Sequence, residues 1–409
     1  MKETTFKIYN YRWIALFVFM ATVAINQLFW ITFAPITSSA VSYYQVSTLG
    51  IGFLSMIFLI IYIFVSIPAS WVIDTYGIRI AVGIGVLLTG IFGLMRGLAG
   101  SNYSLVLVAH IGVAIGQPFI LNAVTKVAAR WFPFKERATA VGLGLLAAYL
   151  GIVVGLVLTP YLMLFMGING MLLIYGVAAV IIAVAFFVFW REHPSTPPCL
   201  PGQEVRSLVF DGLKQVLRKK NFILLIAVIF IGLGIFNAVT TWIEEIVRPR
   251  GFSITQAGII GGLMIVGGII GAVIIPLLSD RYHRRVPFML MALFGATVGL
   301  IGITFALNYL LLLVSAFVLG FFLLSAGPIA FQYGAEVTYP APEGITNGLL
   351  LMSGQISGII FIFGMDFFRS AHTGSMNPSL IVFIILLFLS LLISTEFKES
   401  VIMQQKGSN

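Results

Sequence analysis

The chain has very little charge and almost no cysteine. Only 9% of its 409 residues are Asp, Glu, Lys or Arg, whereas a soluble domain of this size carries about a quarter. Its surface is therefore too poor in charge for an ordinary water-soluble protein. The single cysteine, Cys199, cannot form a disulfide within the chain, and no Cys/His cluster has metal-ligand spacing. We expect no metal and no other cofactor.

Catalytic groups are equally scarce. The four histidines, His110, His193, His283 and His372, are far apart in the sequence and fit no haem-attachment or zinc-protease pattern. An enzyme acting inside the membrane would need a nucleophile with its base, or metal ligands, within the apolar segments. Because no such set is present, we expect the protein not to be an enzyme.

Apolar residues are what the chain has in abundance: 60% of the sequence, with a mean hydropathy of +1.07. The apolar runs are continuous and reach about 20 residues, which is the length of a transmembrane helix. A membrane β-barrel would instead show short alternating segments. The sequence predicts an all-α polytopic membrane protein, embedded in the lipid bilayer, with twelve transmembrane helices. They are expected at 13–38, 50–73, 79–99, 104–130, 138–163, 169–190, 222–247, 254–279, 286–306, 309–334, 344–367 and 376–395. The first run is too long for a signal peptide, so we expect it to be retained.

A polar stretch divides these segments into two sets of six. Residues 191–221 contain four prolines and then the basic run that ends in Lys219 and Lys220. We therefore predict an N-terminal six-helix bundle at 1–190, a cytoplasmic linker at 191–221 and a C-terminal six-helix bundle at 222–409.

The formal charge of +9 is distributed unevenly. If the N-terminus is cytoplasmic, all but four of the 23 Lys and Arg residues fall on the cytoplasmic side, and the exceptions are Arg96, Arg248, Arg250 and Arg369. This asymmetry predicts a multi-pass protein of the cell membrane with both termini in the cytosol. It also explains the positive charge without a nucleic-acid partner, which we do not expect. We expect a monomer.

The two halves contain an internal repeat. Corresponding residues are separated by 206 or 207 positions in three pairs: Asp74 and Asp280, Glu136 and Glu343, Gly151 and Gly358. A constant offset is typical of transporters whose parallel halves are related by an axis along the membrane normal. Glycines such as Gly151 and Gly155 also predict close packing between helices.

Two polar turns follow the second and eighth apolar segments. The first contains Asp74, Gly77 and Arg79, and the second contains Asp280 and Arg281. An acid at the cytoplasmic end of a span can pair with a helix N-terminus or a loop arginine and so hold an inner gate closed. The alternative is a simple interfacial turn in which Gly77 adopts a left-handed conformation.

Polar side chains in the middle of several spans are candidates for substrate binding, because burying them costs free energy unless they have partners. They are Asn26 and Trp30 in the first span, Gln117 and Asn122 in the fourth, Asn237 and Thr241 in the seventh, and Gln355 in the eleventh. They fall at similar depths in both halves, where a midplane substrate cavity is expected. For each residue alone, an interhelical hydrogen bond is the alternative.

Glu244 and Glu245 are adjacent acids near the outer end of the seventh span. They either face water at the membrane interface or attract a cation or proton at the outer mouth. No Asp, Glu, Lys or Arg lies clearly at mid-membrane, so an obligatory buried proton carrier is not evident.

These residues together resemble one branch of the major facilitator superfamily, the feline leukaemia virus subgroup C receptor-like (FLVCR-like) transporters. The similar stretches are Asn26–Ile31, Leu54–Met56, Pro68–Arg79, Gln117–Leu121, Trp131–Phe132, Ala335–Gly344, Gly348–Leu350 and Gln355. The Glu336–Gly344 run is the most specific, whereas the Asp74 loop is shared by the whole superfamily.

The resemblance implies a central cavity that holds an ammonium headgroup in the members that carry choline and ethanolamine. In that comparison Trp30, Gln117 and Gln355 match cavity residues, and a tryptophan face attracts an ammonium group without a counter-charge. Two positions depart: Asn237 stands where those members have Tyr, and Leu59 where they have Met. Without the second aromatic, the cage for a methylated ammonium is incomplete.

The sequence therefore predicts a secondary transporter that moves a small organic solute by alternating access. An amine or zwitterion similar to choline or ethanolamine is the favoured solute class. A proton-coupled multidrug or metabolite efflux carrier is the alternative within transport. A solute-sensing receptor is the alternative of another class, but sensors of that kind usually add a large cytosolic domain, and about a dozen residues follow Glu396.

Overall fold

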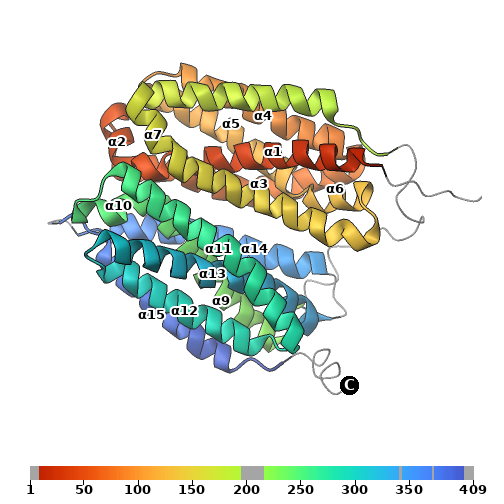
Figure 1. Ribbon diagram of the computed structural model, residues 1–409, viewed down its shortest axis with the longest axis vertical. Helices are drawn as coiled ribbons and strands as arrows, with labels where there is room; N and C mark the ends of the chain where they lie inside the picture. The colour runs from red at the N-terminus through yellow and green to blue at the C-terminus, as the bar shows by residue number, and fades with distance from the viewer. Residues whose placement is uncertain (1–8, 195–215, 340–342, 371–372, 400–409) are drawn as a thin grey trace, which may run out of the picture. The chain divides into compact units, whose positions relative to one another are not determined.

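A computed structural model describes residues 9–194, 216–339, 343–370 and 373–399, and every regular element in this part of the chain is a helix. The chain forms two compact units, Met1–Arg206 and Ser207–Asn409. Each is described by itself. The boundary falls within the predicted linker, most of which, including Cys199, lies outside the described residues. Within each unit the long helices lie side by side and run roughly parallel or antiparallel (Figure 1).

The described residues of unit 1 form seven α-helices and one short 3-10 helix. They are α1 (Tyr11–Ile31), η1 (Ala34–Ile36), α2 (Thr37–Tyr44), α3 (Thr48–Tyr76), α4 (Ile78–Leu98), α5 (Tyr103–Leu121), α6 (Val124–Trp131) and α7 (Phe134–Phe189). Helix α7 has 56 residues and is interrupted at Gly167, whose φ of 69° and ψ of 175° are not helical. A helix of that length would extend about 80 Å, which is enough for two crossings of a bilayer. Its two arms match the predicted spans at 138–163 and 169–190.

Unit 2 repeats the pattern of six long helices. Its elements are α9 (Lys220–Thr241), α10 (Ile243–Val247), η2 (Arg248–Arg250), α11 (Ile254–Tyr282), α12 (Val286–Phe305), α13 (Tyr309–Thr338), α14 (Glu343–Phe367) and α15 (Asn377–Thr395). Across the described residues, eleven helical stretches are long and apolar enough to cross a membrane. Counting α7 as two arms gives the predicted twelve, and the predicted fold class is confirmed.

The helix ends follow from local sequence. The side chains of Ser47, Asn102 and Asn308 accept hydrogen bonds from backbone N–H groups in the first turns of α3, α5 and α13. Ser253 and Gln256 form a capping box at the start of α11. Caps of this kind satisfy N–H groups that have no partner inside the helix.

Helix packing depends on glycine in both units. A Cβ atom added to Gly151 would lie 2.1 Å from the Ala24 carbonyl oxygen, so α7 reaches α1 only because a side chain is absent. In unit 2, Gly271 and Gly320 allow the same close approach between α11 and α13. The prediction of close packing at Gly151 is confirmed, and the reason is direct backbone contact.

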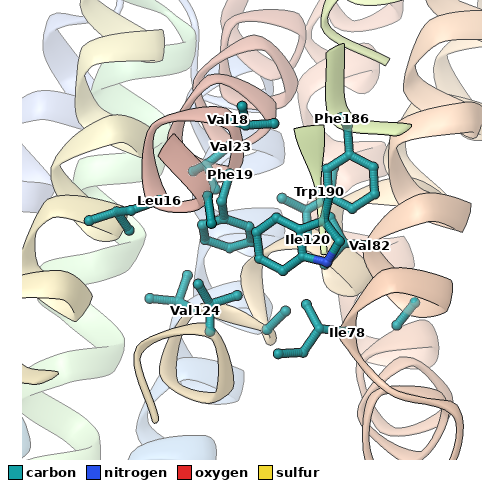
Figure 2. Packing of buried hydrophobic residues seen from close by; sticks show 14 of the residues in the cluster. Leu16, Val18, Phe19, Val23, Ile78, Val82, Ile120, Val124, Phe186 and Trp190 are labelled. Atoms are coloured by element: carbon teal, nitrogen blue, oxygen red, sulfur yellow. The ribbon is translucent and has the colours of Figure 1, made fainter. Parts of the chain in front are cut away.

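An aromatic cluster holds one end of unit 1 together. The Trp190 ring stacks on Phe186 with centroids 5.3 Å apart and lies 6.2 Å from Phe19. Figure 2 shows Trp190 surrounded by these rings and by Ile120 and Val82. The cluster attaches the last turn of α7 to α1, α4 and α5, and this places Glu192, two residues further on, beside the start of α4.

Candidate functional site

For each unit we call the end where its first helix begins the near end, at Tyr11 of α1 or Lys220 of α9, and the opposite end the far end. The candidate residues fall into three groups. Turns lie at the near end, isolated polar side chains lie between the two ends, and charged residues lie at the far end.

In unit 1, Trp30 is fixed by two hydrogen bonds. Its indole N–H donates to the Ser55 carbonyl at 3.3 Å, and the Ser55 hydroxyl donates to the Trp30 carbonyl at 3.4 Å. These bonds attach the last turn of α1 to α3, on which Leu59 is buried one turn further along. Because the indole N–H is occupied, only the ring face of Trp30 is left for other contacts.

Gln117 differs from the two candidate asparagines of this unit, Asn26 and Asn122. It is buried on α5, and its amide forms no hydrogen bond with any described residue. Asn26 donates to Thr89 Oγ1 at 3.2 Å, and Asn122 accepts from the Tyr62 hydroxyl at 2.8 Å. Asn122 also donates to Ser66 and Ser70. The asparagines thus form interhelical hydrogen bonds, whereas the Gln117 amide is left available.

In unit 2, α9 and α14 bring the corresponding polar residues together. The Asn237 amide nitrogen donates to the Gly354 carbonyl at 3.3 Å, and Gln355 is the next residue on α14. Gln355 is half-buried and has no hydrogen-bond partner among the described residues. Thr241 lies one turn beyond Asn237, is buried, and its hydroxyl has no partner either.

The near-end turn of unit 1 is built around Glu192, which the sequence did not single out. One carboxylate oxygen accepts from the Ile78 backbone N–H at 2.9 Å, and the other accepts from the Arg79 N–H at 2.6 Å. Arg130 pairs with the same carboxylate at 3.2 Å. Gly77 has a φ of 89°, and a Cβ atom there would lie 2.5 Å from Glu192 Oε1. The side chain of Glu192 therefore caps α4.

The other predicted residues of this turn lie at its rim. Asp74 forms an exposed ion pair with Lys126, with Nζ and Oδ1 2.9 Å apart. Arg79 contributes its backbone N–H to the Glu192 cap, and the residue is exposed.

Unit 2 has a matching turn. The Glu399 carboxylate accepts from the backbone N–H groups of Arg285 and Val286, at 3.0 and 2.9 Å, and so caps α12. The Arg285 side chain pairs with Asp280 and, at 3.2 Å, with Glu336. Arg281 is exposed. The partner of Asp280 is therefore Arg285. Glu192 and Glu399 are separated by 207 positions, so the repeat offset is a signal by which both could have been found.

At the far end of unit 2, Glu244 and Glu245 are buried and do not face water. Glu245 pairs with Arg248, with Nη2 and Oε2 2.9 Å apart, and also with Arg369. Glu244 lies 4.0 Å from Arg248. The hydrogen bond to Glu245 raises the pKa of Arg248, because it stabilises the charged guanidinium.

Arg250 uses its guanidinium differently. It donates to the carbonyls of Ile303 and Ala306, at 2.7 and 3.0 Å, where α12 ends. Partial burial lowers its pKa. Within the described ranges, no group of three or more His, Cys, Asp or Glu residues is placed to hold a metal ion.

Comparison with known proteins decides the family. The sequence profile of the Major Facilitator Superfamily matches residues 14–362. The chain belongs to the major facilitator superfamily. Solute carrier family 49 member A3 of Xenopus tropicalis is 31% identical over 380 residues, covering 87% of this chain and 78% of that protein. The human choline/ethanolamine transporter FLVCR2 is 28% identical over 376 residues, covering 87% and 71%. The FLVCR-like resemblance is thereby confirmed.

Solved structures agree on the fold. A bacterial homologue of the human lysosomal transporter Spinster, in an inward-facing and unoccupied conformation, matches with a TM-score of 0.75 at 16% identity, covering 95% of this chain and 98% of that one. The nucleoside transporter NupG matches with a TM-score of 0.73 at 13% identity, covering 95% and 100%. The protein is a membrane transporter of the major facilitator fold.

Proposed function

We propose that the protein moves a small organic solute with an ammonium group across the membrane by alternating access. The observation that carries this proposal is the similarity to choline/ethanolamine transporters over 87% of the chain. It is supported by buried residues that suit such a solute. In unit 1 we assign Trp30 and Gln117 to substrate contact, and in unit 2 Asn237 and Gln355.

Trp30 would bind the ammonium group. Its indole N–H is held by Ser55, so the ring is fixed in orientation and presents its face to a ligand. A cation over a tryptophan face gains about 0.5–2 kcal/mol, and more as water is excluded. No carboxylate is required, in keeping with the lack of acids in mid-helix. The free amide of Gln117 would then bind the solute hydroxyl.

Asn237 favours a primary ammonium over a quaternary one. Its amide nitrogen already donates to Gly354, so its carbonyl oxygen is the group left to accept a hydrogen bond. Ethanolamine has N–H groups to donate, whereas choline has none. An asparagine at this position also lacks the aromatic face that a trimethylammonium group would contact. We therefore infer that ethanolamine-like solutes are preferred.

The near-end turns would provide the gate. Asp74, Gly77 and Arg79 lie at one turn, Asp280 and Arg281 at the other, and each turn is capped by a carboxylate from the end of its own unit. Release of these contacts would free the helices to move between conformations.

Uptake by purified protein in liposomes tests the substrate class. We expect saturable uptake of radiolabelled ethanolamine, with choline transported at least about tenfold less efficiently because it lacks the N–H bond to Asn237. Trp30→Ala should abolish uptake, and Trp30→Phe should retain part of it because a weaker cation–π face remains. Trp71→Ala is the matched control, since Trp71 is exposed on α3.

Two results would overturn the proposal. Uptake of ethanolamine by Trp30→Ala at the rate of the parent protein would remove the ammonium inference. An ethanolamine preference that survives Asn237→Ala would show that Asn237 does not select the headgroup.

A further inference from the structure

The far end of unit 1 contains a buried arginine without a counter-ion. Arg96 lies in the last turn of α4 and is 0% exposed. Its guanidinium is enclosed by two phenylalanine rings, with Cζ 4.7 Å from the centroid of Phe29 and 5.2 Å from that of Phe33. A guanidinium stays charged in proteins, and a buried charge is costly unless it is paired. Aromatic faces offset only part of that cost.

No acid of unit 1 neutralises it. The described acids of this unit are Asp74, Glu136 and Glu192, and all three are at the near end. They pair with Lys126, Arg12 and Arg130. Ile78, where α4 starts, is 18 residues from Arg96, a distance of about 27 Å along the helix. The charge of Arg96 is therefore unbalanced within the described part of its own unit.

The hydrogen bonds of Arg96 show which part of it is unused. Only Nη1 has a partner, the Phe29 carbonyl at 3.4 Å, while Nε and Nη2 are buried with none. The N–H groups of Nε and Nη2 point in the same direction and form one edge of the planar guanidinium. That edge is the fork that binds both oxygens of a carboxylate.

Two further polar side chains beside Phe33 have no hydrogen-bond partner. The His110 ring is 6.0 Å from Phe33 and 5.0 Å from Phe58, and neither of its nitrogens makes a hydrogen bond. The Tyr44 ring is 6.1 Å from Phe33, and its hydroxyl is buried without a partner. By contrast, the Tyr175 hydroxyl is satisfied by Thr159 at 2.9 Å. Three side chains beside Phe33, those of Arg96, His110 and Tyr44, thus have buried polar groups without a hydrogen-bond partner.

We propose that Arg96, His110 and Tyr44 form a binding site for a small carboxylate inside unit 1. The Nε and Nη2 edge of Arg96 would hold the two oxygens, and the Tyr44 hydroxyl and one His110 N–H would donate to them. The site is enclosed by the apolar rings of Phe29, Phe33 and Phe58. Because these rings exclude water, the hydrogen bonds are strengthened. The site uses residues other than those assigned to the ammonium group, and it would accept a free carboxylate or the carboxylate of a zwitterionic solute.

Access to the site would involve α2. Tyr44 is the last residue of this eight-residue helix, and the next residue, Gln45, has a left-handed backbone with a φ of 54°. That conformation is unfavourable for a residue with a side chain. A movement of α2 that relaxes Gln45 would withdraw Tyr44 and open the guanidinium edge to an anion.

Thermal unfolding of the purified full chain in detergent, titrated with sodium acetate and with sodium chloride at equal ionic strength, tests this site. We expect acetate to raise the melting temperature saturably by about 3 °C or more, with chloride at least about tenfold weaker. Arg96→Gln should lose the acetate response and, without acetate, be at least as stable as the parent. Arg96→Lys keeps the charge but not the fork, so its preference for acetate over chloride should fall about tenfold.

Two controls make the result specific. Arg218→Gln removes an exposed positive charge and should respond to acetate like the parent. Ethanolamine uptake tests the ammonium proposal and acetate stabilisation tests this site, so the failure of one is distinguishable from the failure of the other. An equal acetate response in Arg96→Gln, or none in the parent, would overturn the site. A stronger response to chloride or phosphate would overturn its assignment to a carboxylate. If Arg96→Gln does not fold, the Arg96→Lys comparison decides the question.

Discussion

The near ends of the two units resemble each other, and their far ends do not. At each near end, a carboxylate from the end of the unit caps the helix that follows the second long helix: Glu192 caps α4 and Glu399 caps α12. At the far end of unit 2, the carboxylate of Glu245 pairs with Arg248 and Arg369. At the far end of unit 1, Arg96 forms no ion pair with a described residue, and its Nε and Nη2 are buried without a partner.

This difference distinguishes contacts that maintain the structure of both halves from contacts that recognise a solute. A contact repeated in both halves serves a task that both halves share, such as holding a turn closed. A feature present in one half alone, such as the Arg96 cluster, serves a task that symmetry does not require, such as recognising a solute. Substitutions that act on one member of a repeated pair therefore show how far the two near ends are equivalent.

The largest effect is expected at Arg285. It is buried, and it neutralises both Asp280 and Glu336. Removing one partner of a buried ion pair costs about 3–5 kcal/mol because the other charge is left without compensation. Arg285→Gln should lower the unfolding free energy by that amount, measured by thermal or denaturant unfolding of the purified protein.

Lys126→Gln is the matched variant in unit 1. Its partner Asp74 is exposed, so its loss should cost less than about 1 kcal/mol. Equal destabilisation by Arg285→Gln and Lys126→Gln would show that burial does not distinguish the two turns.

A smaller effect is expected at Gly77. Its φ of 89° and ψ of 173° fall in a region that is almost confined to glycine, and an added Cβ would contact Glu192. Gly77→Ala should therefore destabilise the protein by about 1–3 kcal/mol. At the turn of unit 2, His283 has a φ of 54° without being glycine. His283→Ala is therefore the control and should be close to neutral in unfolding and in transport.

Much of the fold was predictable, because each span is an apolar run of the required length. The helix pairs built on Gly151 were predictable in kind, since a small residue permits close approach. The interruption of α7 at Gly167 was predicted as the boundary between the apolar runs at 138–163 and 169–190. In the structure α7 extends on both sides of this residue. These features depend on the types of residue within each apolar run and do not require knowledge of their distant partners.

The partners at the two turns were not predictable in the same way. Glu192 lies 114 positions from Ile78, so only the folded chain brings them together. Asp280 is followed by three arginines, and which of them returns to it depends on the turn at His283. The prediction named Arg281, the nearest in sequence, whereas the turn directs Arg285 toward Asp280. Of the polar residues in mid-span, the sequence could not separate Asn122, which is fully hydrogen-bonded, from Gln117, which is free.

The smallest effect, and the most direct test of equivalence, is expected from Glu192→Gln and Glu399→Gln. Glutamine can still accept a backbone hydrogen bond, but it loses the charge that favours a helix N-terminus, so each change should cost about 0.5–1 kcal/mol. Glu192→Gln also removes the ion pair with Arg130 and should be the costlier of the two.

Because both changes weaken a near-end contact, we expect each to raise the rate of solute exchange in liposomes. A raised rate in only one variant would show that a single turn controls the gate, and a lowered rate in both would show that the caps support folding and do not hold the gate closed.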